Sequence, residues 1–184
     1  MYTHILWTSL ILTSLVACTD AESIPFPDLR GEVPIIVSAE NPALTAYNYY
    51  GLHEQDNREE LQTLTGIDPV HTEWCAAFVN AVLEESSIPS NNDHKYPLTA
   101  RAFLDWGVSI DTTDIKPGDL VIFPRGNSNW QGHVGFYLRS IERNGQEYYF
   151  ILGGNQSNKV SIELYSAKTA LGIRRKEMVD KIIN

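Results

Sequence analysis

The chain has 184 residues, of which 43% are hydrophobic and 20% charged, and its formal net charge is −9. This length and composition fit one globular domain with a hydrophobic core of its own. The acidic balance, without a cluster of Lys and Arg, argues against a nucleic-acid partner, because phosphate contacts need grouped positive charge. The sequence carries no dimerisation signal, and we expect a monomer.

Residues 1–17 are predicted to be a secretory signal peptide, because the segment is apolar, lacks Asp, Glu, Lys and Arg, and is too short to span a bilayer. Its end, LVAC, resembles the lipobox of bacterial lipoproteins, which implies cleavage before Cys18 and lipidation of that thiol. An ordinary cleaved signal and an uncleaved anchor are the alternatives. Thr19 after the cysteine is similar to outer-membrane lipoproteins, so we expect a lipid anchor in the outer membrane facing the periplasm. In a Gram-positive host the anchor would lie on the outer face of the plasma membrane.

The two cysteines are predicted to have different chemical states. If Cys18 is lipidated, Cys75 is the sole free thiol of the mature chain, whereas a Cys18–Cys75 disulfide is the alternative in a chain without lipid. Residues 18–40 contain three prolines that disfavour a helix, and they are predicted to tether the lipid to a folded domain at 41–184.

The first half of this domain is predicted to be helical. Asn41 is a candidate N-cap for a first short helix, and a second is expected within residues 56–66, ending at Gly66. Thr72 is a candidate N-cap for a third helix with apolar residues at helical spacing, which Pro89 ends. A further short helix is expected within residues 99–107.

After the turn sequence KPGD the pattern changes to strands. Five apolar or alternating runs, separated by turn residues, are predicted to be strands at 120–123, 133–138, 147–152, 160–165 and 171–175. Helices followed by antiparallel strands predict an α+β domain in which the N-terminal helices pack on a sheet of about five strands.

Cysteine hydrolase chemistry needs a nucleophile, a base and an orienting group, and three places in the sequence could supply them. Cys75 lies in the first turn of the third predicted helix, where the helix dipole and free N–H groups favour a thiolate. His133 opens a strand, and Asn155 and Gln156 end the next one, where an amide could hold one imidazole nitrogen. Taken singly, Cys75 could be a small core residue, His133 a structural histidine, and the amides turn residues.

Four blocks in this order, TEWCAAFV, KPGDLVIF, GHVGFYL and LGGNQS, resemble the CHAP and NlpC-type cysteine peptidases and amidases that cut bacterial cell-wall peptides. The resemblance covers roughly residues 43–175. It implies a papain-like fold with Cys75 as nucleophile, His133 as base and Asn155 as orienting residue. Many CHAP domains carry a Glu where this chain has Gly153, which makes Gln156 a second candidate for the orienting role.

The resemblance implies hydrolysis of amide bonds in peptidoglycan stem peptides, and it leaves open an endopeptidase or an N-acetylmuramoyl-L-alanine amidase. Candidate substrate-binding residues are Trp130, Gln156 and Trp74, with core packing the preferred interpretation of Trp74. An alternative function is a catalytically inactive scaffold that binds peptidoglycan.

No metal or other cofactor is expected. A metal site using Cys75, His133 and either His71 or His53 is a further alternative, but the sequence has no CxxC, HxH or HExxH spacing to support it.

Overall fold

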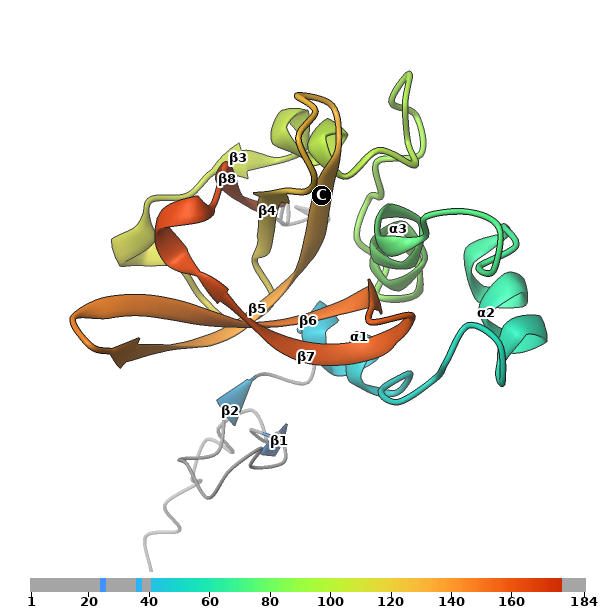
Figure 1. Ribbon diagram of the computed structural model, residues 1–184, viewed down its shortest axis with the longest axis horizontal. Coiled ribbons are helices and arrows are strands. Elements are labelled where there is room, and N and C mark those ends of the chain that lie inside the picture. Colours follow the sequence, from blue (N-terminus) through green and yellow to red (C-terminus); the bar gives the residue numbers. More distant parts are fainter. Residues whose placement is uncertain (1–23, 26–35, 38–40, 177–184) are drawn as a thin grey trace, which may run out of the picture.

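The computed structural model describes residues 24–25, 36–37 and 41–176, and Figure 1 shows their arrangement as an α+β domain. The predicted signal peptide and Cys18 lie outside the described residues. Within the predicted tether, β1 (Ile24–Pro25) and β2 (Ile36–Val37) pair as a short antiparallel ladder, which the proline content did not predict.

The first two helices begin close to where they were predicted, and the second also ends as predicted. The α1 helix (Pro42–Tyr47) has Asn41 as its N-cap, and the Asn41 side chain accepts a hydrogen bond from the backbone N–H of Ala43, as predicted. The α2 helix (Arg58–Thr65) ends at Gly66, whose φ of 73° is the left-handed conformation that glycine adopts without a steric penalty.

The third helix, α3 (Cys75–Glu85), begins later than predicted. Trp74 and not Thr72 occupies the N-cap position, and it makes no side-chain capping bond. Thr72 is exposed, whereas Trp74 is fully buried beneath the helix, so the packing of the indole sets where the helix starts. As a result, Cys75 is the first residue of α3.

The sheet has six antiparallel strands in the order β3-β8-β4-β5-β6-β7. The five predicted strands are confirmed as β4 (Leu120–Pro124), β5 (Gly132–Arg143), β6 (Gln146–Gln156), β7 (Lys159–Ser166) and β8 (Gly172–Arg175). The sixth strand, β3 (Val108–Ser109), was not predicted, because two exposed residues are too few to show a period.

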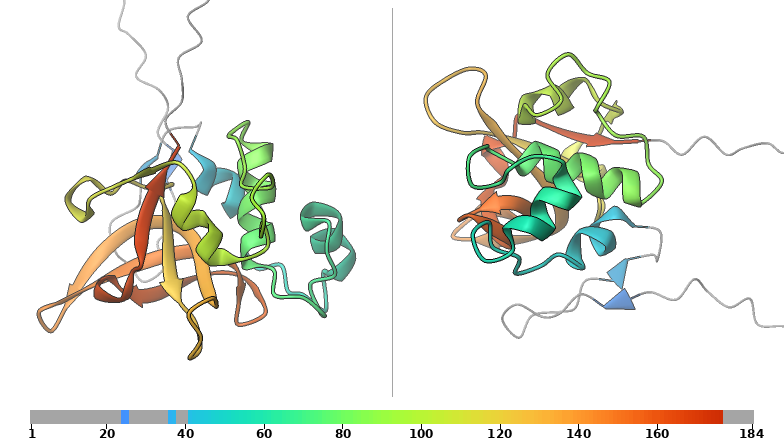
Figure 2. Two further views of the ribbon diagram at one scale, coloured as in Figure 1. Left: turned by 90° about the horizontal axis from the view of Figure 1, so that it is seen from above. Right: turned by 90° about the vertical axis from the view of Figure 1, so that its right-hand side faces the viewer.

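The three α-helices lie on one side of this bent sheet, and α3 packs against β5 and β6 (Figure 2). The main core fills the space between them, and it takes Val134, Phe136 and Leu138 from β5, as the alternation in that strand predicts. A second buried cluster, which includes Tyr137 and Tyr149, lies on the other face of the sheet.

Three 3₁₀ helices complete the domain: η1 (Ala100–Asp105), η2 (Thr112–Asp114) and η3 (Ala167–Thr169). In η1, the Arg101 Nε donates a hydrogen bond of 2.7 Å to the backbone carbonyl of Gln131. This bond ties the loop between β4 and β5 to η1, just before His133.

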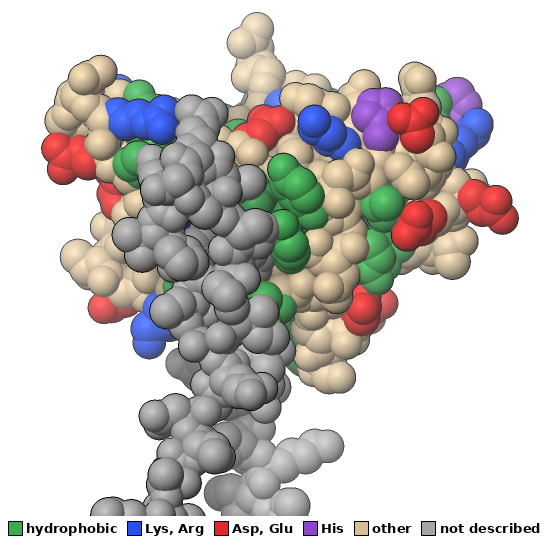
Figure 3. Space-filling view, turned by 90° about the horizontal axis from the view of Figure 1, so that it is seen from below, with side chains coloured by type: hydrophobic (Ala, Val, Ile, Leu, Met, Phe, Trp, Pro, Cys, Tyr) green, Lys and Arg blue, Asp and Glu red, His purple; other side chains and the backbone are tan. Residues whose placement is uncertain are grey.

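Figure 3 shows one face of the molecule, on which acidic and basic side chains are scattered and do not form a basic stripe. Over the described ranges, no helix has the length and apolar character needed to cross a membrane.

Candidate active site

Cys75 lies where the start of α3 meets the start of β5. Its side chain is 4% exposed, and the backbone N–H groups of Ala76 and Val134 act on the thiol as hydrogen-bond donors that lower its pKa. Because Val134 directly follows His133, this contact brings the helix carrying the thiol onto the strand carrying the imidazole. Cys75 is the one free cysteine in the described part of the chain.

The imidazole of His133 is held by Gln156. His133 is 2% exposed, and its Nε2 lies 2.9 Å from the Oε1 of Gln156, which is 1% exposed. The Nε2 of Gln156 donates to the backbone carbonyl oxygens of Ser161, at 2.6 Å, and Ile151, at 3.2 Å. Because the amide nitrogen of Gln156 donates to these two carbonyls, its Oε1 faces the imidazole. An amide oxygen can only accept, so His133 Nε2 must carry the hydrogen.

The other imidazole nitrogen, Nδ1, is buried and has no hydrogen-bond partner. With Nε2 protonated, Nδ1 carries the free lone pair of the neutral ring and is the nitrogen that can accept a proton. An unpaired polar atom in a protein interior is costly, and such atoms are frequent where chemistry requires them.

Asn155 does not hold the imidazole, which corrects the prediction made from the order of the motifs. The Asn155 Nδ2 donates a hydrogen bond of 2.7 Å to Glu73, while Gln156 contacts His133. The register of β6 against β7 shifts between Gly153 and Gln156, and Asn155 has a φ of 55°. This irregularity breaks the alternation of faces and turns Gln156 toward the site.

Aromatic packing fixes the plane of the imidazole. The ring of Tyr165, on β7, stacks on that of His133 with a centroid distance of 5.3 Å and an interplanar angle of 10°. Phe123, on β4, stacks with Tyr165 in turn, at 4.6 Å. The imidazole is therefore constrained both in its plane and at Nε2.

Two glycines let β6 pass close to the site. A Cβ added at Gly154 would lie 2.6 Å from Trp74 Cζ3, and one added at Gly153 would lie 3.3 Å from His133 Nε2 and from the Oε1 of Gln156. Only a residue without a side chain fits at Gly154, because the nearest atoms belong to packed core side chains.

Burial keeps the cysteine and the histidine neutral in this structure. It raises the pKa of the Cys75 thiol above its ordinary value, although the Arg125 charge and the two backbone N–H groups act in the opposite direction. Burial also lowers the pKa of His133 to about 4, against the hydrogen bond that the ring donates to Gln156, which raises this pKa. The expectation of a thiolate at the helix N-terminus is thus not met in this structure, because desolvation of the thiol outweighs the nearby N–H groups and the Arg125 charge.

The three predicted substrate-binding residues differ in their exposure to solvent. Trp130 is 66% exposed on the loop between β4 and β5, so its side chain is accessible to a ligand. Trp74 is buried and donates its indole N–H to Glu54 Oε2 at 3.2 Å, and it is a core residue. Gln156 is buried against His133, so neither it nor Trp74 presents a surface to substrate.

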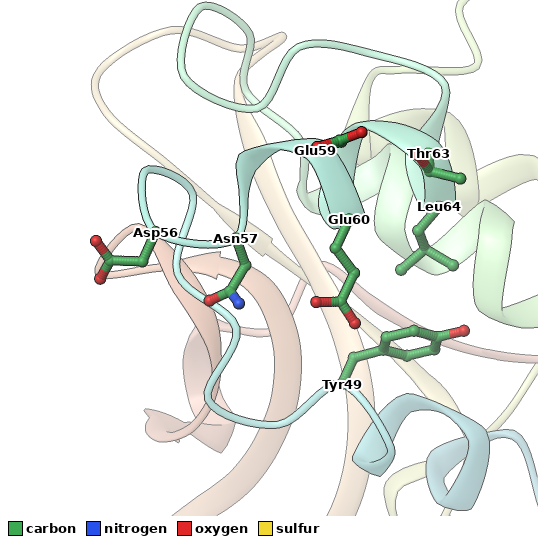
Figure 4. Close-up of a pocket in the computed structure, with 7 residues that line it drawn as sticks. All are labelled: Tyr49, Asp56, Asn57, Glu59, Glu60, Thr63 and Leu64. Atoms are coloured by element: carbon green, nitrogen blue, oxygen red, sulfur yellow. The ribbon is translucent and has the colours of Figure 1, made fainter.

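The hollow drawn in Figure 4 lies elsewhere, between α2 and the loop after α1. Its volume is about 640 Å³, and its lining residues are Tyr49, Asp56, Asn57, Glu59, Glu60, Thr63 and Leu64. None of these is a candidate catalytic residue, so the hollow is separate from the predicted chemistry.

The metal alternative needs His53 or His71 beside Cys75 and His133, and each of these two histidines instead lies near an aspartate. His53 lies 3.8 Å from Asp56, and His71 lies 3.9 Å from Asp68, each within its own loop. Across residues 41–176 and the two short strands before them, no group of three or more His, Cys, Asp or Glu is placed to hold a metal ion.

Three residues close to the candidate site were not predicted from the sequence: Arg125, Glu73 and Tyr165. Arg125 Nη1 donates to Glu73 Oε2 at 2.7 Å, and its Nη2 donates to the backbone carbonyl of Asn155 at 3.0 Å. A single loop arginine and a single strand tyrosine belong to no spacing pattern, so nothing in the sequence marks them.

Comparison with known proteins yields likenesses among solved structures and no relative by sequence. Among solved structures, an NlpC/P60 family protein from Bacillus cereus ATCC 10987 aligns with a TM-score of 0.43 and 16% sequence identity, over 78% of this chain and 41% of that one. The chain therefore spans less than half of that neighbour's length. No protein-family model matches the chain, and no curated protein does. The likeness is weak, and it identifies neither a catalytic residue nor an activity.

Proposed function

We propose that the protein is a cysteine hydrolase of amide bonds, with Cys75 as nucleophile, His133 as base and Gln156 as orienting residue. The observation that carries this proposal is the imidazole of His133, whose Nε2 is fixed by Gln156 and whose Nδ1 is buried and unpaired. The next residue on the strand, Val134, contacts the Cys75 thiol through its backbone N–H. A structural histidine in a core would be expected to satisfy both nitrogens.

In the proposed reaction, His133 Nδ1 takes the proton of the Cys75 thiol as the sulfur attacks the substrate carbonyl carbon. The first N–H groups of α3, which have no acceptor within the helix, are available to stabilise the oxyanion. As the tetrahedral intermediate collapses, the C–N bond breaks, and Nδ1–H gives its proton to the leaving amine. Nδ1 then takes a proton from water, hydroxide releases the acyl group as a carboxylic acid, and that proton returns to the sulfur.

The proposed substrate is the peptide part of peptidoglycan, cut by an endopeptidase or an N-acetylmuramoyl-L-alanine amidase. This choice is supported by the four sequence blocks that resemble cell-wall peptidases and amidases. Attachment to the membrane through lipidated Cys18, in the outer membrane facing the periplasm, is part of the same proposal. Radiolabelled palmitate incorporated by the wild type and not by Cys18→Ala would support the anchor, and equal labelling would contradict it.

The test of the activity is mass spectrometry of fragments released from purified peptidoglycan by the wild type, Cys75→Ala and His133→Ala. Fragments that appear with the wild type and are absent with both variants would support the proposal, and their masses would name the bond that is cut. Co-sedimentation with the same peptidoglycan tests the scaffold alternative. Binding that Cys75→Ala leaves intact, with no release by any form, would favour the scaffold and reject the hydrolase.

A further inference from the structure

A second hollow lies apart from the candidate catalytic groups. Its volume is about 570 Å³, and it lies between the tip of the β5–β6 hairpin, η2 and η3. Figure 1 shows this hairpin on the side of the domain away from α2 and α3. Tyr149, which lines the hollow, precedes Gln156 by seven residues on β6, a span of about 23 Å at 3.3 Å per residue. The hollow is therefore distinct from the site around Cys75.

The hydroxyl of Tyr149 is the feature of this hollow that the fold does not explain. Tyr149 is 0% exposed, and among the described residues its hydroxyl is buried without a hydrogen-bond partner. Its ring packs edge-on against Tyr137, with a centroid distance of 5.2 Å, and Ser140 acts on the Tyr137 hydroxyl as a hydrogen-bond donor. A phenylalanine at position 149 would fill the same place in the second buried cluster without an unpaired polar atom. The hydroxyl therefore points to a partner that the described part of the chain does not supply.

The environment of this hydroxyl favours a neutral acceptor. Burial raises the pKa of Tyr149, and the charge of Glu147 raises it further. The hydroxyl thus keeps its hydrogen, which it can donate. A ligand carboxylate placed on it would be repelled by Glu147, whereas the carbonyl oxygen of an amide would not.

Two opposite charges stand on the walls of the hollow. Glu147 comes from the start of β6 and Lys168 from η3, and both residues are exposed. Neither side chain makes an ion pair or a hydrogen bond with another described residue. A ligand that matches both charges carries an ammonium group at one end and a carboxylate at the other. The volume lies in the range of small-molecule sites and exceeds what a single amino acid fills.

We propose that this hollow is a binding site for a short peptide with free termini. Glu147 holds its ammonium end, Lys168 holds its carboxylate end, and the Tyr149 hydroxyl donates a hydrogen bond to the amide carbonyl between them. Binding there requires no cleavage, so this inference goes beyond the proposed function and does not depend on it.

The test is calorimetric titration of L-alanyl-L-alanine into the full-length Cys75→Ala protein, which cannot cleave the peptide through Cys75. The N-acetyl form of this dipeptide lacks the ammonium group, and its C-terminal amide lacks the carboxylate. We expect the free dipeptide to bind about tenfold more tightly than either blocked form, because each blocked form loses one charged contact. Equal binding of the three forms, or no binding of the free dipeptide, would overturn the inference.

Variants in the same protein assign the contacts. Glu147→Gln should remove only the preference over the N-acetyl form, and Lys168→Gln only the preference over the amide. Tyr149→Phe should weaken the binding of all three forms by about tenfold, since each keeps the central carbonyl. Tyr137→Phe is the matched control, because its hydroxyl has Ser140 as a partner, and it should leave the affinity unchanged. Unchanged affinity in Tyr149→Phe would overturn the inference, since the dipeptide would then bind elsewhere.

Urea unfolding without peptide tests the premise independently. The Tyr149→Phe protein should unfold at the same urea concentration as its parent or at a higher one, because the hydroxyl that it loses has no partner among the described residues. Tyr137→Phe should unfold at a lower concentration, because it loses the contact with Ser140. A lower midpoint for Tyr149→Phe would mean that the fold itself supplies a partner for this hydroxyl, and it would overturn the inference.

Discussion

Acid should destabilise this protein through His133. The imidazole is buried against Gln156 and Tyr165, and burial lowers its pKa from 6.5 to about 4. Between these two pH values the unfolded chain binds a proton at this residue and the native chain does not, so the free energy of unfolding falls as the pH falls. At about 1.4 kcal/mol for each tenfold change in proton affinity, the stabilisation present above pH 6.5 and lost by pH 4 is about 3 kcal/mol.

The assay is urea unfolding, followed by tryptophan fluorescence, at several pH values between 7 and 4. His133→Asn serves as the reference, because it keeps a hydrogen-bond donor for Gln156 and removes the titration, while every carboxyl group is common to both proteins. We expect the difference in free energy of unfolding between wild type and variant to change by about 3 kcal/mol across this range. Parallel pH profiles would refute the reasoning, since they would mean that His133 has the same pKa in both states.

Three further predictions follow from the contacts around the site. Gln156→Ala should lower kcat/KM for peptidoglycan peptides by about a hundredfold, because the imidazole loses its fixed orientation. The loss of kcat/KM in Asn155→Ala should be at least tenfold smaller. A larger loss in Asn155→Ala than in Gln156→Ala would restore Asn155 as the orienting residue. Gly154→Ala should destabilise by about 2 kcal/mol in urea, because its methyl would meet Trp74 at 2.6 Å; Gly153→Ala, with its nearest atoms at 3.3 Å, should cost less. Trp74→Phe should cost about 1–3 kcal/mol by the same assay, since it leaves Glu54 without its indole donor, and an unchanged midpoint would contradict that bond.

The elements of this fold were predictable where the hydrophobic period was long. The run that became β5 alternates cleanly, and Val134, Phe136 and Leu138 enter the main core as expected. The start of α3 was not predictable, because Thr72 is the better N-cap by propensity, while burial of the Trp74 indole decides the boundary. Tertiary packing overrode a local preference there.

For the candidate site, the sequence indicated which residues belong to it better than it indicated the role of each. Cys75 is the first residue of α3 and His133 the second residue of β5, and the sequence marks both places. Whether Asn155 or Gln156 contacts the imidazole depends on the register shift at the end of β6. The alternation of side chains along a strand does not predict such a shift. Arg125 and Glu73 meet only because the loop after β4 folds over the start of α3.

Because the site is neutral, the residue that holds the imidazole also determines the tautomer of His133. In a thiolate–imidazolium pair both ring nitrogens carry a proton, and no tautomer has to be selected. Here burial raises the pKa of the Cys75 thiol and lowers that of His133, so the reaction would begin from a thiol and a neutral imidazole that has one basic nitrogen. The bond from Nε2–H to Gln156 places that basic nitrogen at Nδ1, the buried atom that has no other partner. The Gln156 amide would therefore decide which atom of His133 can take the proton, in addition to how the ring is oriented.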